Sequence, residues 1–244
     1  MRLDVYLSEN SLADSRTEAK NFVVAGCVTV DGKTVTKPSY DVPEGACVSI
    51  DKSSKKYVGR GGLKLEAALV EFDVNPRGAL ALDIGASSGG FTDCLLQNGA
   101  THVIAVDSGS GQMAESLRLD SRITVIENYN ARYMEPSDFD YAPTLAVMDV
   151  SFISATYVMP AVRRVLAPGG DFICLIKPQF EVGRSGLGKG GIVKDDRTRR
   201  SALDKVRSFA ESIGFKTVKT MVSPIVGGDG NIEFLAHFVN AEEL

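Results

Sequence analysis

Residues 80–96 read LALDIGASSGGFTDCLL, and this stretch indicates the fold more strongly than any other part of the chain. An apolar run that contains Asp83 leads into a glycine-rich turn, and a second apolar run begins after Gly90. Glycines at a turn between a strand and a helix let a ligand approach the backbone, and the free amides at the helix start attract an anionic group. The stretch therefore predicts a strand–turn–helix unit that binds a ligand.

From residue 63 onward, segments of strand character alternate with segments of helix character. We expect strands at residues 79–83, 102–107, 123–127, 145–149, 171–176, 217–221 and 232–239. We expect helices at residues 63–72, 90–98, 112–118, 155–166 and 197–213. This alternation predicts an α/β domain with a Rossmann-like, doubly wound and mostly parallel sheet.

A second acidic residue indicates what the turn binds. Asp107 ends the run HVIAVD, about twenty residues after the turn, where a carboxylate can accept hydrogen bonds from the ribose hydroxyls of a nucleoside. Dinucleotide binders usually show G-x-G-x-x-G, whereas this turn shows G-x-x-x-G-G after an acidic residue. In this it resembles motif I of the class I methyltransferases, which implies S-adenosylmethionine rather than NAD. The cofactor-binding residues would then be Asp83, Gly85, Ser87, Gly89, Gly90, Phe91 and Asp107, with Asn128 or Asn130 near the adenine.

The same turn also matches a hydrolase motif. Residues 85–89 fit the G-x-S-x-G nucleophile elbow, and Asp149 and His237 follow in the order of a hydrolase triad. The serine nevertheless follows the first core strand, and this hypothesis leaves Asp107 without a role. His237 also lies in a strand-like run, where a structural histidine is the commoner case. A hydrolase is therefore the weaker interpretation.

Composition and charge limit the class of protein. A hydrophobic fraction of 44% and a charged fraction of 24% are typical of a soluble globular protein and exclude a disordered one. The net charge of −4 excludes a uniformly basic nucleic-acid binder. Basic residues nevertheless form two groups, which either bind RNA phosphates or are solvated surface. They are Lys52, Lys55, Lys56, Arg60 and Lys64, and Lys189, Lys194, Arg197, Arg199 and Arg200.

Cysteines and apolar runs bear on the cellular compartment. The four cysteines lie in apolar stretches without CxxC spacing, which favours buried, reduced thiols and a cytoplasmic location. No apolar run approaches the roughly 20 residues of a spanning helix, so no membrane partner is expected. The two histidines lie in separate segments and no cysteines are paired, so no metal is expected.

The first 56 residues form a predicted small α+β domain, separated by the polar run 52–56 from a second domain at 57–244. Residues 15–42, SRTEAKNFVVAGCVTVDGKTVTKPSYDV, combine an Arg-led helix, a glycine, a Val-x-Val strand and Asp-Gly-Lys. This pattern resembles the RNA-binding module of ribosomal protein S4. The resemblance implies RNA contacts by Arg16, Lys20, Lys33 and Lys37, to which we add Arg60.

Four charged residues occur where apolar ones would be expected: Lys64, Asp149, Lys177 and Glu233. The set resembles the tetrad of the FtsJ-type 2′-O-ribose methyltransferases. The runs RGGLKL, MDVSFIS, LIKPQFEVGR, GKGGIV and GNIEF resemble the TlyA (hemolysin A) family over essentially the whole chain. The family resemblance implies methylation of cytidine riboses in ribosomal RNA or a ribosomal subunit.

A ribose hydroxyl is a poor nucleophile at neutral pH, so its methylation needs a positioned base or a stabilising charge. A lysine can act as a base only if its pKa falls by several units. We assign Lys177 as the candidate base, Asp149 as the residue that orients it, and Lys64 and Glu233 as the residues that hold the ribose.

Two other functions stay open at this point. The chain could bind RNA as a ribosome-associated factor without catalysing, or it could lyse membranes as the family name hemolysin implies, although no lytic amphipathic segment is visible. The glycine-rich run from Pro178 to Gly191 is expected to form a mobile loop over the RNA.

Overall fold

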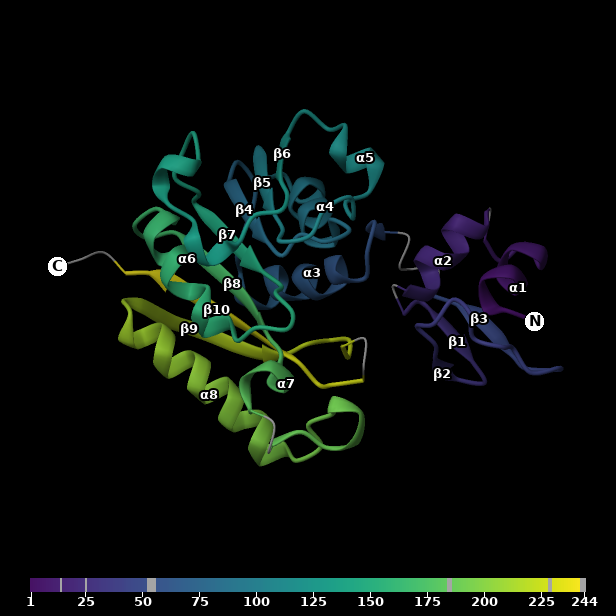
Figure 1. Cartoon of the computed structure of the whole chain (residues 1–244). Coiled ribbons are helices and arrows are strands. Elements are labelled where there is room, and N and C mark those ends of the chain that lie inside the picture. The colour runs from purple at the N-terminus through teal and green to yellow at the C-terminus, as the bar shows by residue number, and fades with distance from the viewer. Residues whose placement is uncertain (14, 25, 52–55, 184–185, 228–229, 242–244) are drawn as a thin grey trace. The chain divides into compact units, whose positions relative to one another are not determined.

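The computed structural model of the chain describes residues 1–13, 15–24, 26–51, 56–183, 186–227 and 230–241. It contains two compact units, Met1–Arg60 and Gly61–Leu244, which are drawn in Figure 1. The boundary of the units falls at residue 60, whereas the predicted domain boundary falls after residue 56. Most of the predicted linker, residues 52–55, lies outside the described residues.

The first unit packs two helices against a small antiparallel sheet, as the sequence pattern predicts. The helices are α1 (Leu3–Glu9) and α2 (Arg16–Val24), and the strands are β1 (Val28–Val30), β2 (Lys33–Thr34) and β3 (Val48–Ile50), in the order β2-β1-β3. Asp31 and Gly32 both have positive φ, at 49° and 75°, which is the conformation of a tight two-residue hairpin turn. The buried core consists mainly of Leu3, Leu7, Ala19, Phe22, Val23 and Val28.

A sheet of seven strands forms the centre of the second unit, in the order β6-β5-β4-β7-β8-β10-β9. The strands are β4 (Leu80–Ile84), β5 (His102–Val106), β6 (Ile123–Ile126), β7 (Leu145–Met148), β8 (Asp171–Ile176), β9 (Phe215–Val222) and β10 (Phe234–Asn240). The first five strands in this order are parallel to one another, and β10 pairs antiparallel with both β8 and β9. The predicted Rossmann-like, mostly parallel sheet is confirmed.

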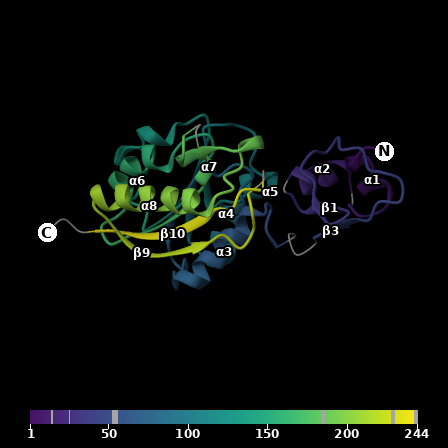
Figure 2. The same ribbon diagram turned by 90° about the horizontal axis from the view of Figure 1, so that it is seen from below.

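Helices cover both faces of this sheet. They are α3 (Gly61–Phe72), α4 (Gly90–Gln97), α5 (Glu115–Arg118), α6 (Met159–Val165), α7 (Pro178–Glu181) and α8 (Asp196–Ser212). Figure 2 shows α6 and α8 on one face and α3 on the other. The helix expected at residues 155–166 is split into a 3₁₀ turn, η4 (Ala155–Tyr157), and α6, which has a proline in its first turn. Proline is tolerated there because the first helical N–H groups have no intrahelical partner.

Two further expectations differ from the structure. The glycine-rich run predicted as a mobile loop begins with α7, and its residues 184–185 lie outside the described residues. Three of the four cysteines are buried, but Cys47 is exposed. It directly precedes β3, a strand at the edge of the small sheet, where one face meets solvent.

The central strands are buried over almost their whole length, and all four residues of β7 are buried. Such strands are apolar except where they end. Because parallel strands end at the same edge of a sheet, the polar residues that follow β4, β5, β7 and β8 gather there. This edge holds the candidate site.

Candidate active site

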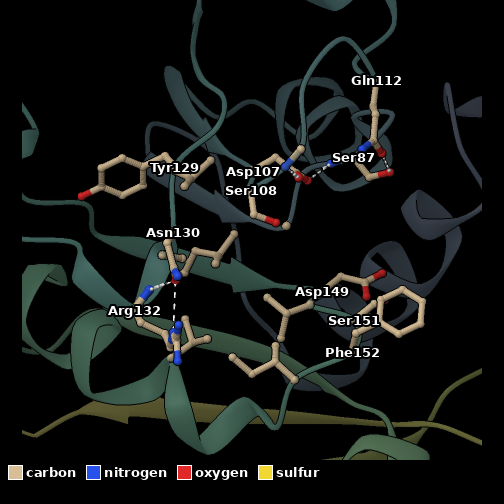
Figure 3. A pocket seen from close by; sticks show the side chains of 18 residues that line it. Ser87, Asp107, Ser108, Gln112, Tyr129, Asn130, Arg132, Asp149, Ser151 and Phe152 are labelled. Atoms are coloured by element: carbon tan, nitrogen blue, oxygen red, sulfur yellow. Dashed lines mark hydrogen bonds between the residues drawn. The ribbon is translucent and has the colours of Figure 1, made fainter.

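A cavity of about 580 Å³ opens at the carboxyl ends of β4, β5 and β7. One part of its wall contains Ser87, Asp107 and Gln112, and another contains Asp149, Ser151 and Phe152, as Figure 3 shows. A volume of this size lies within the range of pockets that take small organic ligands or cofactors. The cavity therefore has the place and the size expected for a nucleoside site in an open α/β sheet.

Gly85 lets two strand ends come together beneath the cavity. Its φ is +83°, and an added Cβ would lie 2.4 Å from the carbonyl oxygen of Asp149. Gly89 is restricted in the same way, because a Cβ there would lie 2.3 Å from Cδ1 of Leu117. Any side chain at either position would force backbone or core atoms apart, so the glycine spacing reflects packing as well as access for a ligand.

Asp107 is held firmly at the cavity wall. Its Oδ2 accepts a hydrogen bond of 2.8 Å from the amide of Ser87, and its Oδ1 accepts one of 2.7 Å from the amide of Gly109. Each carboxylate oxygen has a second lone pair. The aspartate can therefore still accept hydrogen bonds from the two hydroxyls of a ribose.

The predicted cofactor-binding residues divide into two groups. Gly85, Ser87, Asp107 and Asn130 line the cavity, and Oδ1 of Asn130 accepts hydrogen bonds from the backbone amide and Nε of Arg132. The other five lie outside the cavity wall: Asp83, Gly89, Gly90, Phe91 and Asn128.

Asp83 supports the turn from inside the protein. Its side chain is fully buried, and its Oδ2 accepts a hydrogen bond of 2.6 Å from the hydroxyl of Thr92 in α4. Burial raises the pKa of Asp83 to about 7, although the hydrogen bond from Thr92 opposes this. The acid that precedes the glycines thus joins β4 to the helix after the turn.

The four residues of the predicted tetrad form two ion pairs. Nζ of Lys64, in the first turn of α3, lies 2.5 Å from Oε2 of Glu233, and both side chains are almost fully buried. Nζ of Lys177 lies 2.5 Å from Oδ1 of Asp149, with 12% and 24% of the two side chains exposed. Lys177 also donates a hydrogen bond of 2.7 Å to the hydroxyl of Ser151.

Strand pairing brings the two ion pairs to the same edge of the sheet. Phe234 of β10 pairs antiparallel with Ile176 of β8. Glu233, which precedes Phe234, and Lys177, which follows Ile176, therefore lie beside each other at that edge. Asp149 follows β7, which is the neighbour of β8 on its other side. The antiparallel pairing of β10 with β8 thus places Glu233 at the edge of the sheet where Lys177 and Asp149 also lie.

Burial corrects one expectation for the first basic group. Lys64 is buried against Glu233, so its ammonium does not lie on the surface where an RNA phosphate could reach it. Lys52 and Lys55 lie outside the described residues. In the second group, Arg199 and Arg200 form ion pairs with Asp196.

Several wall residues were not predicted. Phe152 is 92% exposed, has φ of +64°, and its ring centroid lies 5.4 Å from that of Phe180. An exposed phenylalanine in left-handed backbone is rare and is held only where its surroundings impose it. Ser108, Gln112, Tyr129, Arg132 and Ser151 also line the cavity. Their residue types are ordinary in loops, so no local pattern identifies them.

The hydrolase hypothesis does not fit this geometry. Nε2 of His237 lies 2.7 Å from Oδ1 of Asp171, and its ring stacks on Phe72. Asp149 pairs with Lys177, and the hydroxyl of Ser87 donates to Oε1 of Gln112. Ser87, Asp149 and His237 are therefore not hydrogen-bonded to one another, as a catalytic triad requires. Within the described ranges, no group of acidic, histidine and cysteine residues is arranged to hold a metal ion.

The residues predicted to bind RNA lie in the first unit. Lys20, Lys33 and Lys37 are exposed, and the guanidinium of Arg60 lies against Gly26. Arg16 is 55% exposed, but its Nε lies 3.1 Å from Oδ2 of the buried Asp4.

Acid is expected to loosen this unit through Asp4. A hydrogen bond from Arg2 lowers the pKa of the Asp4 carboxyl to about 2 in the folded chain, below its ordinary value of 3.8. Asp4 therefore stabilises the fold fully above about pH 4, and this contribution is lost as the pH falls toward 2. The difference in free energy of unfolding between the natural chain and Asp4→Asn should shrink over that interval in urea titrations. An unchanged difference from pH 5 to pH 2 would contradict this.

Comparison with known proteins gives consistent results for both units. The model of the FtsJ-like methyltransferase family matches residues 57–239, and that of the S4 domain matches residues 1–47. The 16S/23S rRNA (cytidine-2′-O)-methyltransferase TlyA of Mycobacterium tuberculosis H37Rv is 40% identical, over 96% of this chain and 87% of its own. Hemolysin A of Brachyspira hyodysenteriae is 43% identical, over 98% of this chain and 100% of its own.

Solved structures agree with the fold. A Streptococcus thermophilus protein provisionally called a hemolysin is 43% identical and superposes with a TM-score of 0.80, covering 100% of this chain and 89% of its own. An S-adenosylmethionine-dependent methyltransferase from Mesorhizobium loti, at 15% identity, has a TM-score of 0.53 and covers 72% of this chain and 97% of its own. The second likeness supports the fold alone.

The sheet order, the cavity at its edge and the FtsJ match together define a class I methyltransferase that carries an S4 domain at its N-terminal end. Both the predicted fold and the predicted enzyme class are confirmed. The chain belongs to the TlyA/hemolysin A family, as the motif resemblance predicts.

Proposed function

We propose that this chain transfers a methyl group from S-adenosylmethionine to the 2′-hydroxyl of a cytidine in ribosomal RNA. The observation that carries the proposal is the position of Lys177, whose ammonium lies between Asp149 and Ser151 where these two residues line the cavity. Relatives whose names specify cytidine-2′-O methylation support the choice of substrate.

The cavity suits the cofactor. Gly85 has no side chain, so a nucleoside can approach the backbone there. The anchored carboxylate of Asp107 can accept hydrogen bonds from its ribose, and Asn130 offers a side-chain amide. Asp83, Gly89, Gly90, Phe91 and Asn128 would support these groups from behind the wall. When bound, the cofactor supplies an electrophilic methyl group.

Each member of the tetrad has a proposed task. Lys177 first releases its own proton to solvent and then, as a neutral amine, accepts the proton that leaves the ribose hydroxyl. Asp149 and Ser151 orient its Nζ for this step. The buried pair of Lys64 and Glu233 shapes the adjoining edge of the sheet, and through that edge it would position the substrate ribose. The remaining rate acceleration comes from holding the hydroxyl in line with the methyl carbon.

Phe152 is placed to contact the substrate base. Its ring is exposed at the cavity wall, three positions after Asp149, and Phe180 backs it. Stacking of a base on an aromatic ring contributes about 1–3 kcal/mol. Phe152→Ala should raise the KM for RNA about 5- to 150-fold and leave the Kd for S-adenosylmethionine unchanged, whereas Phe152→Tyr should retain RNA binding. Steady-state kinetics with varied RNA would measure this. An unchanged KM in Phe152→Ala would remove Phe152 from the substrate site.

Exposed lysines of the S4 domain would contact RNA phosphates. Lys20, Lys33 and Lys37 form no ion pair among the described residues, and Arg16 and Arg60 would add to them. Phosphate contacts position RNA without reading its sequence, so the choice of cytidine would depend on the cavity. A protein that acts on ribosomal RNA would work in the cytoplasm.

Mass spectrometry of ribosomal RNA nucleosides, from cells with and without the gene, tests the proposed function. Loss of one 2′-O-methylcytidine in the deleted strain is expected. An unchanged nucleoside profile, together with RNA binding but no calorimetric binding of S-adenosylmethionine, would favour a non-catalytic RNA-binding factor instead.

A lytic function is suggested by the name hemolysin, which one relative and two solved structures carry. Across the described part of the chain, no helix has the length and apolar character to cross a bilayer. Release of a trapped dye from liposomes by the purified protein would support a lytic function. If no dye were released, lysis would be excluded as an alternative to the methyltransferase proposal.

A further inference from the structure

Glu181 is a buried carboxylate to which the tetrad gives no task. It ends α7, which begins directly after Lys177, and only 2% of its side chain is exposed. A buried carboxylate is unfavourable unless hydrogen bonds and an opposite charge compensate it. The identity of its partners therefore indicates what it is for.

Both oxygens of Glu181 bind the segment that follows β7. Oε2 accepts a hydrogen bond of 2.6 Å from the hydroxyl of Ser154, and Oε1 accepts one of 2.8 Å from the amide of Ala155. Ser154 is the N-cap of η4, so Glu181 satisfies an amide at the start of that turn. Nζ of Lys205, on α8, lies 3.5 Å from Oε2 and donates to the backbone carbonyl of Glu181 at 2.8 Å.

The segment that Glu181 binds is the one that carries the cavity residues Asp149, Ser151 and Phe152. Lys177 holds the first part of this segment through Asp149 and Ser151, and Glu181 holds its last part through Ser154 and Ala155. Between them, the ring of Phe180 lies against that of Phe152. Residues 177–181 and 149–155 are thus fastened together at both ends.

We infer that Glu181 is a positioning residue that sets the register of the Lys177 segment against the Asp149 segment. This inference rests on the proposed function. The charged side chain at 181 acts on catalysis through Lys177, Asp149 and Phe152 and does not itself touch the substrate. If Glu181 releases Ser154 and Ala155, the segment shifts relative to Nζ of Lys177, and displacement of about 1 Å at a reacting group can cost on the order of 100-fold in rate.

Single-turnover methyl transfer to ribosomal subunits from a strain without the gene tests this, with labelled S-adenosylmethionine and the full chain. Glu181→Gln should lower the rate constant at saturating cofactor and RNA by roughly 10- to 100-fold and leave the Kd for S-adenosylmethionine within about 2-fold. Ser154→Ala, which removes one of the two contacts from the other side, should give a smaller loss of about 3- to 10-fold. Both variants should also change the pH profile of the rate, because the surroundings of Lys177 change.

Asp171→Asn is the matched control. Asp171 begins β8 at the end opposite Lys177, and its replacement alters the hydrogen bond with Nε2 of His237 without touching the site. This variant should keep the natural rate within about 2-fold even if its Tm falls as far as that of Glu181→Gln. Equal loss of rate in the two variants would show that Glu181 only stabilises the fold, and a natural rate in Glu181→Gln would overturn the inference.

Hydrogen exchange measured on residues 149–157 provides a readout that does not need activity. Exchange there should be faster in Glu181→Gln than in the natural chain or in Asp171→Asn. If the natural chain transferred no methyl group, the proposed function would fail, and exchange alone would decide the role of Glu181. Unchanged exchange in Glu181→Gln would then overturn it.

Discussion

Replacement of Lys177 by arginine is expected to lower the rate of ribose methylation by about 100-fold or more, nearly as much as replacement by alanine. Arginine keeps a positive charge beside Asp149 and Ser151, the two partners of the Lys177 ammonium. Its guanidinium does not lose a proton in proteins, so it cannot act as a base. Single-turnover transfer of a labelled methyl group measures the effect.

Comparison of the two variants separates two roles of the lysine. If Lys177→Arg keeps most of the natural rate while Lys177→Ala loses it, the positive charge is what matters and the assignment of a base is wrong. Lys219→Arg is a suitable control, because Lys219 is a half-exposed lysine that pairs with Glu71, between α3 and β9. It should transfer methyl groups at the natural rate.

Removal of Glu233 should cause the largest loss of stability. Lys64 and Glu233 are 5% and 3% exposed, so Glu233→Ala leaves a buried ammonium without its partner. Breaking a buried pair in this way costs about 3–5 kcal/mol in the free energy of unfolding. Urea denaturation followed by circular dichroism would measure the change, and a loss below about 1 kcal/mol would contradict the structure.

A double variant shows what the buried pair is kept for. Lys64→Met together with Glu233→Leu replaces both charges with apolar groups and should recover most of the stability, because apolar replacement of a buried pair is often neutral. Methyl transfer should stay low in this variant if the pair holds the ribose. Recovery of both stability and activity would make the pair purely structural.

Local pattern located some of the residues that line the cavity. Gly85, Ser87 and Asp107 line the cavity as predicted, because each lies in a turn directly after a parallel strand, and such turns meet at one edge of the sheet. The same logic located every strand of the core to within two residues at each end, although it could not tell which acidic residue faces the cavity. Asp83 points into the protein toward Thr92, since alternate residues of a strand face opposite sides.

Contacts between distant segments were beyond such reasoning. The sequence motifs named Lys64, Asp149, Lys177 and Glu233 as a set, but not that they form two pairs. The sequence pattern does not single out Phe152 or Glu181. The left-handed backbone at Phe152 and the burial of Glu181 are consequences of packing.

Residue order alone was enough for the α/β class and the two-part organisation, because both depend on periodicity and spacing along the chain. The cofactor turn and the four residues of the tetrad stay predictions that rest on motif resemblance. Folding decided the rest: which lysine pairs with which acid, which predicted residues reach the cavity, and how Glu181 joins two segments. These depend on the antiparallel insertion of β10 beside β8 and on the packing of α7, where the partners are far apart in sequence. Such contacts form only when the strands have paired, because the order of the strands determines which strand ends lie next to each other.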